Sequence, residues 1–413
     1  MTFDRPLTVL QVTPNLEIGG AQENLRTMAR YLPAAGVHAV VCTFDDGPLR
    51  PEIAAMGVPV EILPGRRHSV LALPAFVLEA LRTRRELIAL VQRHGVDAVQ
   101  TYGLGTLDFL VATLRLTRRV QVWWTIENVR FMVRREHLGR HGWLLRPKRA
   151  AHRCLYRIGA RLVNGIIVVS DEAVSAFRDS VGYRGDKIHV VPNAADLERH
   201  SEKVDREALR AQLGFRPTDH VMTMVGTFKR QKGHAVLVAA LDAVAVRMPH
   251  LHVVLVGAGD LSADIRAQVD AAGLTSRVHF LGSRRDVPAL LAASDSFVLP
   301  SLWEGLSVAL VEAMASSLPV IATAVSGTRQ VMIDQVTGLL VPPGDAGALA
   351  HAVLDLVSDP ARASAMGAAG RRRVVAEFGA AGQADQLAAL FRGPAGAGIA
   401  QPTHAGAIGA VAP

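Results

Sequence analysis

The chain contains few cysteines, few aromatic residues and no apolar run long enough to cross a bilayer. Its cysteines, Cys42 and Cys154, are far apart in the sequence, so no disulfide framework is indicated and a reducing compartment is the simplest expectation. The nearest candidate for an acidic metal motif, Asp45-Asp46-Gly47, follows a predicted strand as a turn would. We therefore expect neither a disulfide-stabilised secreted domain, nor a membrane-spanning protein, nor a metal-dependent enzyme.

The length of 413 residues exceeds what one hydrophobic core usually supports, and about 150 residues per domain leaves room for two or three domains. The first residues include Asp4 and Pro6 and lead directly into a strand pattern, so we expect no secretory signal. Residues 393–413 are rich in Gly, Ala and Pro and are expected to form a flexible tail. These features favour a cytoplasmic protein.

Short apolar runs alternate with helical patterns, which is typical of α/β domains built around parallel sheets. Strands are predicted at 7–12, 37–44, 58–63, 98–101, 120–125 and 165–169, with another ending at Val191, and then at 221–226, 253–256, 278–281, 296–299 and 320–323. Turn-forming residues near Asn193 separate the two series. The sequence therefore predicts two α/β domains, 1–193 and 194–370, followed by a terminal helical segment, 371–392.

Two glutamates eight residues apart, Glu304 and Glu312, lie at a predicted junction between a loop and a helix. The strand pattern at 296–299 ends at a proline and a helical pattern follows, so Glu304 is expected in the turn and Glu312 within the helix. Unpaired N–H groups near Leu306 and Ser307, at the positive end of the helix dipole, could bind a diphosphate. The carboxylates would then bind sugar hydroxyls, although an isolated pair of glutamates is more often exposed to solvent.

The residues around this pair resemble the retaining glycosyltransferases of family four. The resemblance rests on Glu304, seven intervening residues, Glu312, an Ala-Met-Ala triplet and the run 318–323, and it extends more diffusely over residues 7–392. It implies a GT-B fold, in which two Rossmann-like domains face each other across a nucleotide-sugar cleft. It also implies that Glu312 binds the ribose of the donor nucleotide, and that Glu304 lies beside the transferred sugar and the diphosphate.

Gly19-Gly20 follows the first predicted strand and opens the first helical pattern, so the backbone there could approach a diphosphate closely. Two glycines alone are equally consistent with a tight turn that binds nothing. In the resembled family a Gly-Gly loop at this place faces the donor diphosphate, which makes Gly19 and Gly20 candidate donor-binding residues. A competing dinucleotide signal at 257–260 is disfavoured, because Ser262 stands where the Rossmann fingerprint has its third glycine.

A cluster of cations, Lys229, Arg230 and Lys232, follows the strand predicted at 221–226. Cations here would neutralise a departing diphosphate, although many basic loops are merely solvated. The segment resembles the family's Gly-Arg and Lys-Gly motif, which implies that Lys232 is a diphosphate ligand. Thr227 occupies the place of the arginine, so either Lys229 or Arg230 supplies the missing charge or stabilisation of the leaving group is weaker.

Glu127 follows the strand predicted at 120–125, at a place where many members of the family present a histidine. Burial beside two tryptophans would raise the pKa of this carboxyl and suit it to act as a base, but burial would equally explain a structural partner. Transfer with retention is thought to depend more on stabilising the diphosphate than on a protein nucleophile. The resemblance therefore implies a retaining, metal-independent reaction, with the nucleotide-diphosphate sugar as substrate and no separate cofactor.

The segment 130–161 contains ten Lys or Arg and one acidic residue, interleaved with apolar residues such as Trp143. Such a stretch can lie on an anionic membrane surface, and the net charge of +8 is consistent with an anionic partner. A helix with a solvated basic face explains the pattern equally well. No nucleic-acid-binding motif is recognisable, so no nucleic-acid partner is expected.

These observations predict a cytoplasmic glycosyltransferase that transfers a sugar from a nucleotide-diphosphate sugar to a glycan or lipid-linked saccharide, with peripheral association at the inner face of the cell membrane. One alternative is a nucleotide-sugar epimerase of similar fold, which would act on the donor without an acceptor; the paired glutamates argue for transfer. The other is a non-catalytic nucleotide-sugar-binding protein. The departures from the family pattern at Thr227 and Glu127 keep that alternative open.

Overall fold

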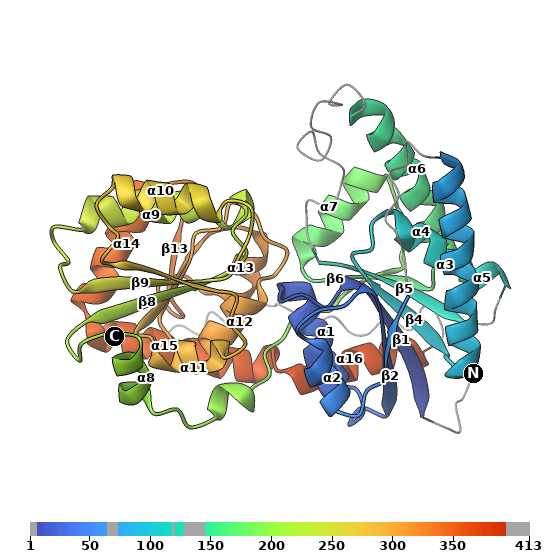
Figure 1. The fold of residues 1–413 in the computed structure, drawn as a ribbon, viewed down its shortest axis with the longest axis horizontal. Helices are drawn as coiled ribbons and strands as arrows, with labels where there is room; N and C mark the ends of the chain where they lie inside the picture. The colour runs from blue at the N-terminus through green and yellow to red at the C-terminus, as the bar shows by residue number, and fades with distance from the viewer. Residues whose placement is uncertain (1–5, 64–72, 118–119, 128–144, 394–413) are drawn as a thin grey trace, which may run out of the picture.

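We describe the fold from a computed structural model, in which residues 6–63, 73–117, 120–127 and 145–393 are described. Two β-sheets lie side by side, each with helices packed on its faces (Figure 1). Within the described residues the first sheet has seven strands in the order β3-β2-β1-β4-β5-β6-β7, and the second has six in the order β10-β9-β8-β11-β12-β13. The strand pairs in both are parallel, which confirms the predicted α/β class with two Rossmann-like sheets.

The first domain contains β1 (Leu7–Asn15), α1 (Gly20–Tyr31), β2 (Val37–Asp45), α2 (Arg50–Ala55), β3 (Val60–Ile62), α3 (Leu73–Arg93), β4 (Ala98–Tyr102), α4 (Thr106–Ala112), α5 (Leu114–Thr117), β5 (Gln121–Ile126), α6 (Leu145–Leu162), β6 (Gly165–Val168), α7 (Asp171–Val181) and β7 (Ile188–Val190). Its central strands are buried along most of their length, as expected of a parallel sheet covered on both faces. Apolar side chains from β1 and β4 fill the cores on the two sides of this sheet.

The second domain contains η3 (Arg199–Ser201), α8 (Arg206–Gln212), β8 (His220–Val225), η4 (Arg230–Lys232), α9 (His234–Val244), β9 (Leu251–Val256), α10 (Ser262–Ala271), β10 (Val278–Gly282), α11 (Val287–Ala293), β11 (Ser296–Leu299), α12 (Val308–Ala315), β12 (Val320–Thr323), α13 (Ser326–Val331), β13 (Leu339–Val341), α14 (Ala346–Ser358) and α15 (Pro360–Glu377), and α16 (Ala380–Arg392) follows. The edge strand β13 has no counterpart among the predicted strands. It has three residues between a glycine and a proline, which is too short to show a periodic pattern.

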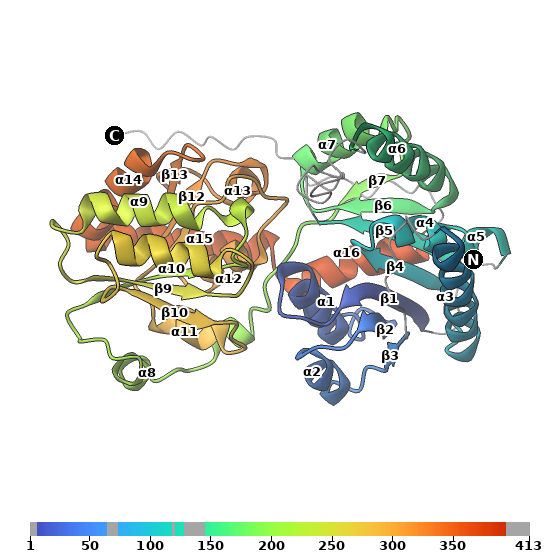
Figure 2. The same cartoon turned by 45° about the horizontal axis from the view of Figure 1, so that its top comes forward.

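The chain passes between the domains twice, and the two crossing segments are hydrogen-bonded to each other. The N–H of Ala195 donates to the carbonyl of Phe378 at 3.0 Å, and the N–H of Ala380 donates to the carbonyl of Ala195 at 3.0 Å. The crossing therefore lies between α15 and α16, so residues 371–377 of the predicted terminal segment 371–392 belong to α15. Figure 2 shows α16 among the elements of the first sheet, where its apolar residues join the core beside β1.

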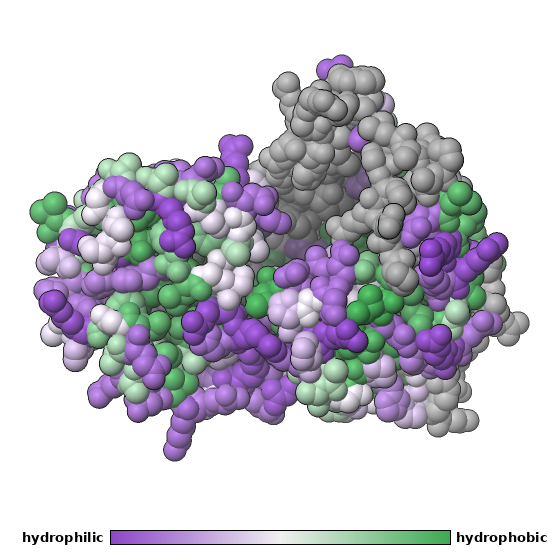
Figure 3. Space-filling view, viewed as in Figure 1, coloured by the Kyte–Doolittle hydropathy of each residue, from purple (hydrophilic) through white to green (hydrophobic). Residues whose placement is uncertain are grey.

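Charged side chains connect the domains at the surface. Arg285, in the loop between β10 and α11, pairs with Glu52 of α2, and Arg30 of α1 pairs with Asp196 of the crossing segment at 2.9 Å. Hydrophilic residues gather where the two bodies meet on the face shown in Figure 3. These ionic contacts, with the crossing segments, hold the carboxyl ends of strands in both sheets around one shared space.

Candidate active site

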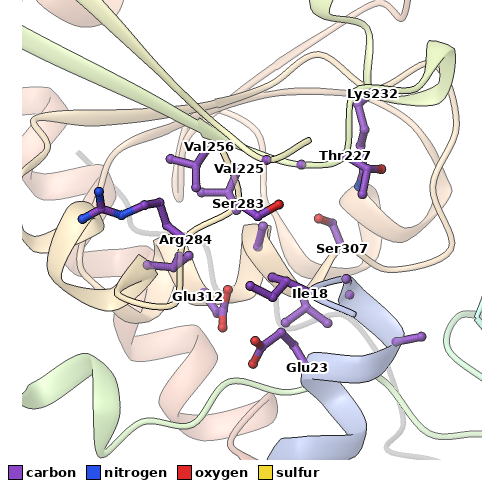
Figure 4. A pocket seen from close by; sticks show the side chains of 18 of the residues that line it. Ile18, Glu23, Val225, Thr227, Lys232, Val256, Ser283, Arg284, Ser307 and Glu312 are labelled. Atoms are coloured by element: carbon purple, nitrogen blue, oxygen red, sulfur yellow. The ribbon is translucent and has the colours of Figure 1, made fainter. Parts of the chain in front are cut away.

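A pocket of about 240 Å³ lies between the two sheets and is lined by residues from both (Figure 4). Its wall is built from loops that follow β1, β5, β8, β9, β10 and β11. In parallel α/β sheets, ligands bind outside the carboxyl ends of the strands, where the strand order reverses. Each sheet reverses its order at its centre, between β1 and β4 in the first and between β8 and β11 in the second.

Gly19 and Gly20 lie on the first-domain side of this pocket, at the start of α1. Gly19 has an extended backbone with φ of −162°, a conformation that any residue adopts. A Cβ added to Gly20 would meet no atom within 4 Å, so packing within the protein does not demand glycine there. At Gly19 a Cβ would lie 2.8 Å from Oε1 of the Gln22 side chain, so space is limited there. The absence of side chains at both glycines leaves backbone exposed to the pocket at a helix N-terminus.

Glu304 is 5% exposed, and both of its carboxylate oxygens accept hydrogen bonds. Oε1 accepts from Lys232 Nζ at 2.6 Å and from Ser301 Oγ at 2.7 Å, while Oε2 accepts from Gln231 at 3.2 Å. A solvated loop charge is thus excluded for this residue. The carboxylate instead holds the ammonium group of Lys232 at the pocket wall.

The backbone after Lys232 explains why the lysine is followed by glycine. Gly233 has φ of +71°, in the left-handed region that favours glycine. A Cβ at this position would come within 2.0 Å of the carbonyl oxygen of Pro300, which immediately follows β11. Close contact between these two loops brings Lys232 to the loop that carries Glu304.

Glu312 lies within α12, as predicted, with its side chain 14% exposed and facing the pocket. Figure 4 shows it beside Glu23 of α1, which belongs to the other domain. Burial raises the pKa of Glu23, and the charge of Glu312 acts in the same direction, whereas Arg26 opposes it. Two facing carboxylates offer several acceptors to the hydroxyl groups of a ligand. Leu306 and Ser307 also line the pocket, immediately before the first turn of α12.

Glu127 lies at the end of β5 and contributes to the same pocket. Burial raises the pKa of its carboxyl group, while hydrogen bonding from Asn193 and Asn24 opposes the shift. Asn193 donates to Oε2 at 2.9 Å, but Oε1 is buried with no hydrogen-bond partner. The loop carrying Gly305 touches the backbone of Glu127 so closely that a Cβ there would lie 2.1 Å from the Glu127 carbonyl oxygen. Glu127 therefore lies where the domains meet, with one buried carboxylate oxygen that no protein donor satisfies.

Lys229 and Arg230 are exposed and do not line the pocket. Of the three cations, the short turn η4 directs Lys232 toward Glu304. The pocket wall instead contains three arginines that sequence reasoning missed, namely Arg199, Arg284 and Arg285. The signal for the last two was an Arg-Arg pair that follows the strand predicted at 278–281 after two intervening residues, Gly282 and Ser283.

Two further observations concern only the part of the chain that the structure describes. No group of three or more His, Cys, Asp or Glu side chains is arranged to hold a metal ion. No helix there has both the length and the apolar character needed to span a bilayer.

Comparison with known proteins identifies the family. Residues 18–199 match the model described as Glycosyltransferase Family 4, and residues 205–373 match the model described as Glycosyl transferases group 1. Together the two matches cover every strand of both sheets except β1.

Curated relatives include three transferases. The UDP-Gal:alpha-D-GlcNAc-diphosphoundecaprenol alpha-1,3-galactosyltransferase of Escherichia coli is 31% identical over 50% of this chain and 54% of its own length. The GDP-mannose-dependent monoacylated alpha-(1-6)-phosphatidylinositol monomannoside mannosyltransferase of Corynebacterium glutamicum is 31% identical over 57% of this chain and 63% of its own length. The chain thus matches somewhat more than half the length of these two relatives. The 2-deoxystreptamine glucosyltransferase of Streptomyces kanamyceticus is 30% identical over 71% of this chain and 76% of its own length.

Solved structures show the same architecture. The crystal structure of Anabaena Alr3699/HepE in complex with UDP-glucose superposes with a TM-score of 0.76 at 21% identity, over 93% of this chain and 98% of that one. The sucrose-phosphate synthase from Thermosynechococcus elongatus gives a TM-score of 0.76 at 26% identity, over 94% of this chain and 98% of that one. This chain therefore belongs to the family 4 glycosyltransferases and has their GT-B fold.

Proposed function

We propose that the protein transfers a sugar from a nucleotide-diphosphate sugar to a glycan or lipid-linked saccharide, in the biosynthesis of a polysaccharide or glycolipid. The observation that carries this proposal is the pocket between the domains. Exposed backbone at Gly19-Gly20 and the N-terminus of α12 face the same space as Lys232, Glu304 and Glu312. Backbone N–H groups and a cation are suited to a diphosphate, and carboxylates are suited to sugar hydroxyls.

Each residue of the pocket has a distinct role in the proposed reaction. The diphosphate lies between Gly19-Gly20 and Lys232, whose charge stabilises the phosphate as the bond to the anomeric carbon breaks. Glu304 holds Lys232 in place, and Glu312 binds the ribose. The acceptor oxygen forms the new bond to the anomeric carbon, and its proton passes to the departing phosphate oxygen. Glu127, with its free Oε1, orients the incoming hydroxyl group.

The reaction we propose is retaining and independent of metal ions. Both oxygens of Glu304 are already bound by protein donors, so this carboxylate is poorly placed to attack the sugar as a nucleophile. Attack on the same face that the diphosphate leaves, with the phosphate oxygen as the base, requires no protein nucleophile. Lys232 supplies positive charge beside the diphosphate, a role that a metal ion performs at other phosphate sites. No separate cofactor is needed for this chemistry.

A panel of UDP-, GDP- and ADP-sugars tests the proposed function. We expect one donor to be hydrolysed slowly without an acceptor, releasing its nucleoside diphosphate and a sugar whose first-formed anomer retains the donor configuration, detectable by NMR. Conversion of the sugar to its epimer while it remains attached to the nucleotide would identify an epimerase. Tight binding with neither hydrolysis nor transfer to any saccharide acceptor would favour a non-catalytic binding protein.

Relatives support a lipid-borne acceptor, because two of the three described above are named for acceptors carried on undecaprenol diphosphate or phosphatidylinositol. On the part of the basic segment that the structure describes, α6, five arginines are exposed at spacings of three or four residues, which places them along one face: Arg146, Arg149, Arg153, Arg157 and Arg161. Ile158, which is 43% exposed, lies between them in the sequence. Trp143, Arg134 and Arg135 lie outside the described residues. We propose that this face rests on anionic lipid at the inner surface of the cytoplasmic membrane.

Sedimentation with lipid vesicles tests this contact. Attraction of about 1 kcal/mol per basic residue predicts that replacing Arg146, Arg149 and Arg157 with glutamine weakens binding to anionic vesicles by about 3 kcal/mol, on the order of 100-fold. High salt should weaken binding of the parent protein, and neutral vesicles should not bind. The matched control replaces three exposed arginines of the second domain, Arg216, Arg247 and Arg372, and should bind as the parent does. Equal losses for both triple variants would indicate net charge alone rather than a membrane face.

A further inference from the structure

The turn η3, which follows the crossing segment, is fastened to the C-terminal end of α12. Arg371 of α15 donates from Nη1 to the carbonyl of Ala315, the last residue of α12, and from the same atom to the carbonyl of His200 at 3.5 Å. Its Nη2 donates to the hydroxyl of Ser201 at 2.9 Å. The backbone of His200 is thereby held beside α12, one turn from Glu312.

The His200 side chain is 1% exposed and lies between Ser316 and Glu312. Its Nδ1 is 2.9 Å from Ser316 Oγ, and that hydroxyl donates to the carbonyl of Glu312 at 3.0 Å. The Ser316 hydroxyl hydrogen rotates, so the hydroxyl donates either to that carbonyl or to Nδ1 of His200. On the other side of the ring, Nε2 is 3.7 Å from Glu312 Oε1 and has no hydrogen-bond partner.

This geometry decides which form of the ring fits. A neutral imidazole has one N–H, and the tautomer that carries it on Nδ1 would present the lone pair of Nε2 to a carboxylate. Two acceptors facing each other in a buried place are unfavourable. A ring with an N–H on Nε2 presents a donor to Glu312 Oε1, 3.7 Å away, while Nδ1 pairs with the Ser316 hydroxyl.

We propose that His200 is a positioning residue, which holds Oε1 of Glu312 and thereby directs Oε2 into the pocket toward the hydroxyl groups of a ribose. This inference rests on the proposed role of Glu312 in binding the donor nucleotide. Glu312 needs such a partner because Glu23 brings a second carboxylate close to it, and the two negative charges repel each other. The other cations near the turn are engaged elsewhere: Arg371 binds backbone carbonyls, and Arg199 lies 3.8 Å from Glu23 and donates to the carbonyl of Arg285.

A matched pair of variants tests the roles of the two ring nitrogens of His200 one at a time. The amide nitrogen of Gln reaches the region of Nε2, whereas that of Asn reaches only the region of Nδ1. Calorimetry with UDP and GDP, and with their 2′-deoxy forms, measures how strongly the protein prefers the ribose hydroxyl. His200→Asn should weaken binding of the ribonucleotide on the order of tenfold and remove most of that preference, while His200→Gln should retain most of it.

Nucleotide binding by Glu312→Ala shows whether a negative result overturns only the role of His200 or also the proposed function. If Glu312→Ala leaves affinity for both nucleotides unchanged, Glu312 does not bind ribose and the proposed site is wrong. If Glu312→Ala weakens binding but folded His200→Asn keeps the full ribose preference, the positioning role is overturned. In the double variant, His200→Asn should cost nothing beyond Glu312→Ala, because the histidine acts through the glutamate.

A second route is available if His200→Asn fails to fold. Ser316→Ala leaves the imidazole in place and removes the hydrogen-bond partner of Nδ1, so the ring loses its orientation. We expect this variant, checked for folding by thermal unfolding, to lose part of the same ribose preference. An unchanged preference in folded Ser316→Ala would contradict the arrangement described here.

Discussion

Replacing Lys232 with alanine is expected to lower the rate of sugar transfer by about 10²–10³, the scale seen when a charge-stabilising contact to a transition state is lost. The ammonium group is 2.6 Å from Glu304 and faces the pocket, where it meets the diphosphate as negative charge develops on the leaving phosphate. Single-turnover measurement of transfer, with donor affinity measured separately by calorimetry, checks this. Lys203→Ala, which removes an exposed lysine of the second domain, is the control and should transfer at the parental rate.

The contact between Lys232 and Glu304 makes the two residues act together. Glu304→Gln should reduce turnover more than donor affinity, because it releases the ammonium group from its anchor. In the Lys232→Ala background the same change should cost much less, since the anchored group is already gone. Thr227→Arg, which adds a cation to the pocket wall, should raise activity. Parental rates in Lys232→Ala would instead show that the lysine does not serve transfer and would favour the binding-protein alternative.

Glu312→Ala is expected to weaken nucleoside diphosphate binding by about 1.5–3 kcal/mol, the range for lost hydrogen bonds to a charged group. The carboxylate is fixed within α12 and faces the pocket, so no neighbouring residue of that helix can replace it. Calorimetry with the nucleoside diphosphate alone measures the change. Glu207→Ala, which removes an exposed carboxylate of α8, provides the control and should bind normally. Unchanged affinity in Glu312→Ala would remove this residue from the site.

Much of the fold could be predicted because its strands are buried on both faces. Strands such as β11 and β12 appear in the sequence as continuous apolar runs, and the structure places them at the predicted residues. The family prediction is confirmed as well. It depended on Glu304 and Glu312, whose spacing is local and is therefore visible without knowledge of the fold.

Features that depend on contacts between distant segments could not be predicted. Lys229, Arg230 and Lys232 are equivalent as a cluster of charges, and only the turn η4 with its contact to Pro300 selects the last. The sequence did not indicate that Glu23 lines the site, because Glu312, which it faces in the folded protein, lies far along the chain in the other domain. His200 was missed for the same reason, since Ser316 and Glu312 meet it only after folding.

The paired crossing at Ala195 and Phe378–Gly379 also determines how the domains can move. Two backbone segments bonded side by side restrict the relative motion of the domains more than one connecting segment would. We therefore expect the domains to move relative to each other by a hinge at this paired crossing. We also expect a donor to enter or leave the pocket as one domain tilts against the other. The parts of the two domains nearest the crossing should then move least.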